Sequence, residues 1–422
     1  MLSIKQNSPL FFLIDCNQFF VSCELLFQPQ LQGKPVIVLS SNDGCVISRS
    51  KEAKVLGIPM GIPAFKVRDI IRSHRVHLFS SNFSLYGDLS HRVMQVLYHF
   101  APDVEEYSVD EAFLFLRTPH PHDFAFRIRE KILRWTGIPV SIGVGFTKTL
   151  AKLASDLAKV EPTGVLVLKQ QTEQLLAHVD VQSVWGIGKA LSDGLKAQGI
   201  PTALALRQAD PHWIAKRFSS TLMQTVLELQ GTPCFSIEHC PPCRKSLTYS
   251  RSLSKPTENL QVIEELLASY TARVAATLRN EGLLASFLSV FLMTSPFLPR
   301  PYSNSATISL DEPSQYSPTL IAKAKQVLAM IFRSGYLYKK VGIILGGFVV
   351  KERYQLDLFH SDRHMRKKRT KAMQALDHIQ SRFGANSLRF AAEASIQKEQ
   401  TRSDHRSPCF TTAWEELLTV HL

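Results

Sequence analysis

Short apolar runs alternate with stretches of helical periodicity between residues 10 and 168. Residues 10–14 are continuously apolar, which predicts a buried strand that delivers Asp15 to its C-terminal end. Residues 104–116 predict two strands that meet near Ser108-Val109-Asp110-Glu111, where a turn would expose two adjacent carboxylates. Further strands are predicted at 35–39, 45–47, 138–144 and 164–168, and helices from about residue 18 and at 85–100, 123–135 and 147–159.

The order of these elements predicts an α+β fold. It is βαββαβ with a short αβ insertion between residues 35 and 80, which predicts a sheet with helices packed on one face. Residues 179–232 carry mostly helical patterns broken by Gly186, Gly188 and Gly199, and we interpret 233–242 as a linker. The βαββαβ order then repeats, with strands at 246–254, 283–294, 302–310 and 341–350 and helices at 259–281 and 317–334. Residues after 352 lack such regularity and include the basic run Arg366-Lys367-Lys368-Arg369, so we interpret them as an appended tail.

Composition limits the location and the partners of the chain. A length of 422 residues with 45% hydrophobic content allows about two to four domains. No secretion signal precedes Leu10, and no apolar run approaches the ~20 residues of a membrane helix, so we predict a cytoplasmic protein without membrane contact. Lys and Arg outnumber Asp and Glu by 49 to 36, a formal charge of +13, which favours a polyanionic partner but is weak support by itself.

The cysteines leave a metal site open as an alternative. Seven cysteines, an odd number, argue against a disulfide framework and for reduced thiols. Cys234, Cys240 and Cys243 with His239 could form a zinc site. No second CxxC pair accompanies them, and Pro241-Pro242 is equally typical of a linker, which is the interpretation we favour.

Three acidic residues are the candidate chemistry. Asp15 lies at a predicted strand end and Asp110-Glu111 at a predicted turn, so adjacent strands of one sheet could bring them together. Acidic residues at such positions are more often solvated turn formers. Phosphoryl transfer from a nucleoside triphosphate, however, uses two Mg²⁺ ions about 4 Å apart, and Mg²⁺ prefers carboxylate, carbonyl and water oxygens.

Two motifs make the resemblance to a family specific. Asp15-Cys16-Asn17-Gln18-Phe19-Phe20 and Ser108-Val109-Asp110-Glu111-Ala112-Phe113 resemble the two acidic signatures of the Y-family translesion DNA polymerases. The resemblance implies that Asp15 and Asp110 bridge two Mg²⁺ ions, that Glu111 assists the ion at the primer terminus, and that the Cys16 carbonyl coordinates the nucleotide-bound ion. Asn17 stands where many members have a second Asp, but the UmuC branch of the family also has Asn. Phe20 matches the aromatic that excludes a ribose 2′-hydroxyl, whereas Phe19 is interpreted as core.

The same resemblance assigns binding residues. It implies that Lys54 and Lys159 neutralise the incoming triphosphate, although both could be ordinary solvated lysines, and Lys51 stands where other members have an aromatic residue. Gly186-Ile187-Gly188-Lys189 resembles a helix-hairpin-helix turn that approaches a DNA phosphate through backbone N–H groups, with a plain helix cap as the alternative. Arg251, in the second βαββαβ region, suits phosphate contact or a polar strand edge.

The resemblance also implies an architecture and partners. It predicts a ferredoxin-like palm at 1–178 with fingers inserted at about 35–80, a thumb at 179–235, a little finger at 243–352 and a tail at 353–422. Such an enzyme extends a primer on template DNA with deoxynucleoside triphosphates, in error-prone translesion synthesis and SOS mutagenesis. Related proteins of the UmuC branch work with a processed UmuD dimer and with RecA filaments, for which the tail is the expected docking region.

A peptide at the start of the tail predicts a further partner. Gln355-Leu356-Asp357-Leu358-Phe359 resembles the bacterial sliding-clamp-binding motif, with Leu356, Leu358 and Phe359 as its apolar contacts. The alternative is that Leu356 and Phe359 fold back onto the little finger. For the whole chain, the alternatives to a polymerase are a catalytically silent DNA- and clamp-binding scaffold and a metal-dependent nuclease.

Overall fold

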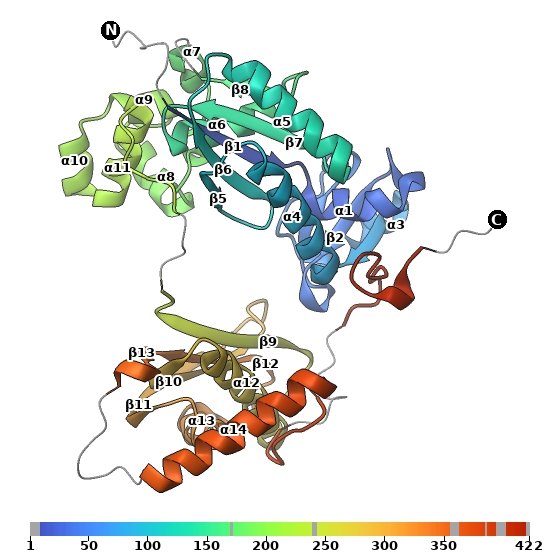
Figure 1. The fold of residues 1–422 in the computed structure, drawn as a ribbon, viewed down its shortest axis with the longest axis vertical. Helices are drawn as coiled ribbons and strands as arrows, with labels where there is room; N and C mark the ends of the chain where they lie inside the picture. The colour runs from blue at the N-terminus through green and yellow to red at the C-terminus, as the bar shows by residue number, and fades with distance from the viewer. Residues whose placement is uncertain are drawn as a thin grey trace. The chain divides into compact units, whose positions relative to one another are not determined.

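The computed structural model describes residues 9–168, 172–238, 243–354, 363–384, 386–393 and 402–418. The chain forms two units (Figure 1), the first made of Met1–Pro241 with Ser403–Leu422 and the second of Pro242–Arg402. The chain therefore leaves the first unit and later returns to it. Among the described helices, none combines the length and the apolar character that a membrane crossing requires.

The central sheet of the first unit has the predicted ferredoxin-like core. Its strands are β1 (Leu10–Cys16), β5 (Val104–Glu106), β6 (Glu111–Leu116), β7 (Val140–Gly145) and β8 (Val165–Val167), in the order β5-β6-β1-β7-β8. β1 pairs antiparallel with both β6 and β7, so the strand that carries Asp15 is central and its backbone is paired on both edges. β8 adds a fifth strand parallel to β7.

Helices cover both faces of this sheet. Leu10, Phe12 and Ile14 of β1 share a core with α4 (Phe83–Tyr98) and α5 (Pro121–Thr136). Side chains alternate along a strand, and Phe11 and Leu13 pack instead with Ala151 of α6 (Lys148–Ala158). The prediction of helices on one face is correct for α4 and α5 and wrong for α6.

Two glycines of β7 explain why α6 can lie on the second face. A Cβ atom on Gly143 would lie 2.0 Å from the backbone nitrogen of Ser155, and one on Gly145 would lie 2.8 Å from that of Ala151. The helix backbone therefore rests directly on the strand, which no residue with a side chain at either position would permit. Asp15 follows Phe11 and Leu13 in the alternation, so it lies on the α6 face.

A smaller αβ module occupies the predicted insertion. After α1 (Phe19–Phe27), β2 (Val36–Leu39) pairs antiparallel with β3 (Val46–Arg49) and parallel with β4 (His77–Ser80). The short helices α2 (Lys51–Val55) and α3 (Arg68–Ser73) accompany this sheet, whose separate small core includes Ile37, Val46, Ile58 and Val67. The predicted strands at 35–39 and 45–47 are confirmed, and they pair with each other.

A helical module follows the sheet in the N-terminal part of the first unit. It comprises α7 (Thr172–Ala177), α8 (Lys189–Ala197), α9 (Ala203–Gln208), α10 (Pro211–Arg217) and α11 (Ser220–Gln230). Glu228 of α11 is fully buried and accepts a 2.9 Å hydrogen bond from the backbone N–H of Thr149, in the first turn of α6. This contact between a buried carboxylate and the N-terminus of α6 holds the helical module against α6.

The second unit confirms the repeated βαββαβ order. Its elements are β9 (Ser246–Thr257), α12 (Leu260–Asn280), β10 (Leu283–Thr294), β11 (Ser303–Ser314), α13 (Ser317–Ile331) and β12 (Tyr338–Gly346), with a short β13 (Val349–Val350). The sheet order is β11-β10-β12-β9, and the two helices pack together over it, as their shared core with the strands shows.

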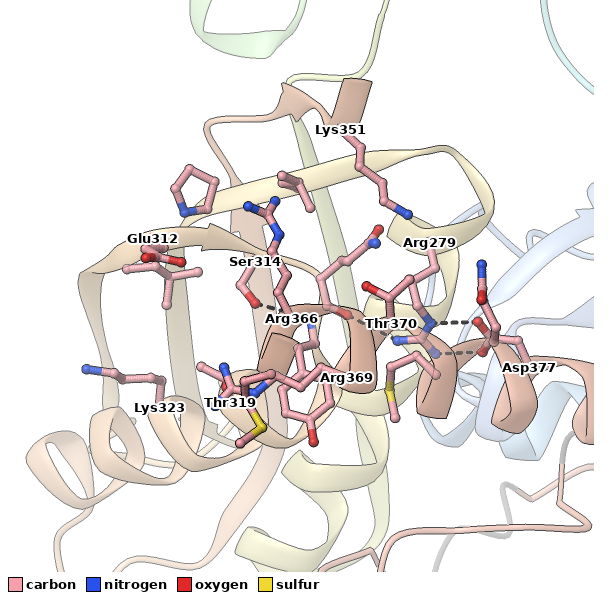
Figure 2. Close-up of a pocket in the computed structure, with 18 of the residues that line it drawn as sticks. Arg279, Glu312, Ser314, Thr319, Lys323, Lys351, Arg366, Arg369, Thr370 and Asp377 are labelled. Carbon is pink, nitrogen blue, oxygen red and sulfur yellow. Dashed lines mark hydrogen bonds and ion pairs between the residues drawn. The ribbon is translucent and has the colours of Figure 1, made fainter. Parts of the chain in front are cut away.

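The tail is more regular than the sequence predicted. Its basic run lies within α14 (Arg363–Phe383), a 21-residue helix that is part of the second unit. Arg279 of α12 makes two 2.7 Å ion-pair contacts with Asp377, and Figure 2 shows this pair at one end of a pocket that α14 helps to line. The expectation of an irregular tail is therefore wrong, because an ion pair and the buried side chains of Met373 and Leu376 hold this helix in place.

Candidate active site

The candidate active site lies at one end of the β1–β6 pair. Asp15 and Glu111 are directly opposed in this antiparallel pair, so both side chains are on the α6 face. Asp110 precedes Glu111 in the turn, and its carbonyl accepts a 2.9 Å hydrogen bond from the N–H of Cys16. The structure therefore brings the three predicted acidic residues together at one edge.

Ser108 organises the turn that presents Asp110 and Glu111. Its hydroxyl donates to the Asp110 carboxylate over 2.7 Å and accepts from the backbone N–H of Glu111 over 3.0 Å. A short side chain that bonds to the backbone two and three residues later is a frequent way to fix a turn. Ser108 is the first residue of the second acidic motif, but only the structure shows that its hydroxyl fixes this turn.

Three lysines of the α6 segment face three neighbouring strands. Lys159, which follows the helix, lies 2.9 Å from Asp15 of β1; Lys152 lies 2.5 Å from Glu111 of β6; and Lys148 lies 2.5 Å from Glu105 of β5. Of these three lysines, only Lys159 was assigned a role from the sequence; the ion pairs of Lys148 and Lys152 are new. The i, i+4 spacing of the two missed lysines places them on one helix face, which is the signal that could have found them.

Burial and neighbouring charges shift the pKa of Asp15 and of Lys159. Burial raises the pKa of Asp15 to about 7, although the Lys159 ammonium opposes the rise and the nearby Glu111 carboxylate adds to it. Burial lowers the pKa of Lys159, but its contacts with Asp15 and Asp156 outweigh burial and raise it. Two carboxylates lie side by side, and lysine ammonium groups balance their charge.

The donor set fits a hard divalent cation. Asp15 and Glu111 could supply carboxylate oxygens, and the Cys16 carbonyl could add a neutral oxygen. The Cys16 side chain is 3% exposed and packs with Phe12 and Ile14 in the core on the other face of the sheet, so only its backbone carbonyl is available at the acidic edge. Within the described residues no three His, Cys, Asp or Glu side chains converge as a complete metal group. Asp110 accepts from Ser108, Glu111 pairs with Lys152, and Asp15 pairs with Lys159.

Phe19 and Phe20 are adjacent in the first turn of α1 but have different environments. The Phe19 side chain is 3% exposed in the main core, as predicted. Phe20 is only partly buried, and its ring lies against Tyr86 of α4 with centroids 4.8 Å apart. Asn17, at the position where many Y-family polymerases have a second Asp, accepts a 2.9 Å hydrogen bond from the Ser141 hydroxyl of β7. Its side-chain amide therefore has a structural partner.

The residues predicted to bind triphosphate or DNA differ in exposure. Lys54 and Lys51 are exposed on α2, and Lys189 is exposed at the start of α8. Gly186 has a φ of +83°, which favours glycine, and a Cβ on Gly188 would meet only open space. The side chain of Ile187 is buried in the core of the helical module, so it can offer only its backbone to a ligand.

Arg251 is in the described part of the second unit, whereas the clamp-binding peptide and part of the possible zinc site are not described. Arg251 lies on β9, with its guanidinium over the Tyr249 ring. Gln355, Leu356, Leu358 and Phe359 lie outside the described residues, as do His239 and Cys240. Cys234 belongs to the first unit and Cys243 to the second.

Family comparisons cover both units and the tail. Residues 14–156 match the model of the impB/mucB/samB family, and residues 244–358 match the C-terminal domain of that family. Residues 370–420 match a domain of unknown function, DUF4113, which overlaps most of α14 and the C-terminal segment. The first match includes Asp15, Asp110 and Glu111.

Individual relatives extend over nearly the whole chain. Protein UmuC of Salmonella typhimurium is 41% identical over 97% of this chain and 100% of that protein, and protein ImpB of the same organism is 39% identical over 98% and 100%. A DNA polymerase IV of Desulfatibacillum aliphaticivorans is 27% identical over 90% of this chain and 95% of its own length. Among solved structures, a Y-family DNA polymerase chimera of Dbh and Dpo4 aligns with a TM-score of 0.64 over 81% of this chain and 99% of that one. At 22% identity, that likeness supports the fold alone.

Proposed function

The chain belongs to the impB/mucB/samB family of Y-family DNA polymerases, and from that premise we propose how its residues carry out translesion synthesis. The reaction is DNA-directed addition of a deoxynucleotide to a primer 3′ end with release of pyrophosphate. One observation carries the proposal: Asp15 and Glu111 face each other at a sheet edge where Lys159 can meet a triphosphate.

Asp15, Asp110, Glu111 and the Cys16 carbonyl would hold the divalent metal that the family relationship implies, and we propose two Mg²⁺ ions. A bound ion lowers the pKa of the attacking 3′-hydroxyl and stabilises charge on the triphosphate. Asp15 and Glu111 are held in place by the paired strands, and Ser108 holds Asp110 through the turn. The acidic edge is therefore organised before substrate binds.

Lysines guide the triphosphate. Lys159 pairs with Asp15 and with Asp156, both over 2.9 Å, and about two-fifths of its side chain is exposed. Incoming phosphate oxygens compete for this ammonium, so Lys159 passes from Asp15 to the triphosphate and frees the carboxylate. Lys54, exposed on α2, supplies a second cation.

Substrate choice and DNA binding use other elements. Phe20 closes the sugar pocket and excludes a 2′-hydroxyl. The Gly186–Gly188 turn leads into α8, whose N-cap residue makes no side-chain capping bond, so its backbone N–H groups are placed for a DNA phosphate. Arg251 contributes phosphate contact from the second unit.

Primer extension past an abasic site tests the function. A purified chain with a primer, an abasic template, the four deoxynucleotides and Mg²⁺ is expected to insert a nucleotide opposite the lesion and to continue. A processed UmuD dimer and a RecA filament, our proposed partners, are expected to increase that extension. A protein that binds the DNA without extending any primer, lesion or not, under all these conditions would favour the silent scaffold instead.

Metal affinity is expected to depend on pH near neutrality. The pKa of Asp15 is raised to about 7, and only the ionised carboxylate binds a cation, so a proton competes with the metal below that pH. The apparent affinity for Mn²⁺ should fall about tenfold for each pH unit below 7 and level off above it. Mn²⁺ titration followed by electron paramagnetic resonance at pH 5.5 to 8.5 measures this, and Asp15→Asn should remove the dependence. An affinity that is flat across the range would contradict the assignment.

Clamp binding is expected to depend on residues 355–359. Gln355→Ala, Leu358→Ala and Phe359→Ala combined should leave synthesis on a bare primer-template intact and remove stimulation by a loaded sliding clamp, because two large apolar contacts are lost. Extension assays with and without clamp measure the effect, and Asp357→Ala serves as a control within the peptide. Full stimulation of the triple variant would exclude this docking peptide, and loss of activity without clamp would support the fold-back alternative.

A further inference from the structure

Residues 403–418, at the end of the described chain, belong to the first unit, and we call them the C-terminal strap (Figure 1). Its backbone pairs with the end of β4 through the Ser80 N–H and the His405 carbonyl, 3.0 Å apart, and the Ser80 hydroxyl accepts from the His405 N–H. Phe410 is 8% exposed in the main core, where its ring stacks on Phe27 of α1 at 4.6 Å. The strap is therefore part of the catalytic unit's fold.

A buried polar cluster lies beneath the strap. Asn82, at the N-cap of α4, donates its side-chain N–H to the carbonyl and the hydroxyl of Ser407, at 3.0 and 3.1 Å. The Ser407 hydroxyl in turn donates to Glu24 Oε1 over 3.0 Å. Asn82 and Glu24 are fully buried, and Ser407 is 6% exposed. The strap thus supplies a hydrogen bond to a carboxylate inside the catalytic unit.

The same carboxylate oxygen holds Tyr86. The Tyr86 hydroxyl donates to Glu24 Oε1 over 2.6 Å, while Glu24 Oε2 is buried without a partner in the described chain. Burial raises the pKa of Glu24, and the hydrogen bonds of Tyr86 and Ser407 oppose that rise. Both hydroxyls converge on one atom, so the position of the carboxylate depends on these two donors.

Tyr86 connects the cluster to the sugar pocket. Its ring lies against Phe20, with centroids 4.8 Å apart and planes at 30°. We propose that the C-terminal strap is a specificity-determining element, in which Ser407 positions the Phe20 ring through Glu24 and Tyr86 and so sharpens discrimination between deoxyribose and ribose. This inference rests on the proposed role of Phe20. It assigns a role to the end of the segment that matches a domain of unknown function.

A strap that positions the Phe20 ring and a strap that only packs predict different effects of Ser407→Ala. Ser407→Ala removes one of two donors to a buried carboxylate, which shifts Glu24 and then the Tyr86 hydroxyl that it anchors. The Phe20 ring loses its fixed backing, so ribonucleotides are admitted more often while the metal-binding edge is untouched. A strap that only packs would change thermal stability and leave sugar choice alone.

The experiment compares kcat/KM for a deoxynucleoside triphosphate and the matching ribonucleoside triphosphate in Ser407→Ala. We expect discrimination to fall about five- to tenfold, mainly through better ribonucleotide use. Ser407→Thr keeps a hydroxyl and should retain wild-type discrimination. Thr412→Ala, at an exposed strap position, is the matched control and should change nothing.

A double-mutant cycle with Phe20→Ala gives the decisive comparison. Where Phe20 is already removed, Ser407→Ala should cause no further loss of discrimination, because both act on the same ring. Unchanged discrimination in folded Ser407→Ala, or equal losses with and without Phe20, would overturn the inference. Tyr86→Phe keeps the ring, loses the hydroxyl and should reproduce the effect if Ser407→Ala does not fold. Failure of the proposed function would give a different result from failure of this inference. In that case the wild type would add no nucleotide, or Phe20→Ala would not alter sugar choice.

Discussion

Asp110→Asn is expected to lower the rate of nucleotide addition about 10³-fold or more, because a lost charged metal ligand removes several kcal/mol of transition-state stabilisation. Affinity for primer-template should stay within about twofold, since the carboxylate serves the metal and not the duplex. The fold should persist, because an amide oxygen can still accept the hydrogen bond of Ser108. Single-turnover incorporation and DNA-binding titrations measure the two effects separately.

A matched control lies a short distance away in the same charge cluster. Asp156→Asn removes a carboxylate that, like Asp15, pairs with Lys159 but belongs to α6 and not to the sheet edge. It should lower the rate only slightly. If Asp110→Asn added nucleotides at close to the wild-type rate in Mg²⁺, Asp110 would have no place in the active site.

Phe20→Ala is expected to raise ribonucleotide incorporation relative to deoxyribonucleotide about 10- to 100-fold. The ring is only partly buried and Tyr86 backs it, so truncation opens space on its exposed side and leaves the core residue Phe19 in place. Base choice should change less, because it depends on the fit of the base pair.

Phe20→Tyr tests whether the ring itself is the barrier. It keeps a flat aromatic side chain and should keep most of the sugar preference. Competition between labelled deoxy- and ribonucleoside triphosphates at one template position gives the ratio directly. An unchanged ratio in a Phe20→Ala protein that still extends primers would place the gate at another residue.

Local patterns predicted most of the framework of the site. The apolar run of 10–14 indicated a buried strand, and the turn residues at 108–111 indicated a hairpin, so Asp15 and Glu111 could be expected near each other. The structure adds the register, in which these two residues are direct partners. Register is set by pairing across a long stretch of chain, which a local pattern does not contain.

The face covered by α6 could not be predicted in the same way. Gly143 and Gly145 are visible in the sequence, but a glycine in a strand marks close approach without saying which element approaches. The pairs of Lys148 and Lys152 depend on that packing and were missed with it. The strap was missed for a related reason, because Asn82 and Ser407 are 325 positions apart and only the tertiary fold brings them together.

Incorporation of each deoxynucleotide opposite each template base, by the wild type and by Asp15→Asn, tests the central claim most directly. The assay uses a defined primer-template with divalent metal and is repeated with a processed UmuD dimer and a RecA filament. We predict that the wild type adds mainly the complementary nucleotide, only with metal, and that Asp15→Asn binds the same DNA and adds none. Addition regardless of the template base, shortening of the primer, or equal rates in the two proteins would contradict a templated polymerase centred on this sheet edge.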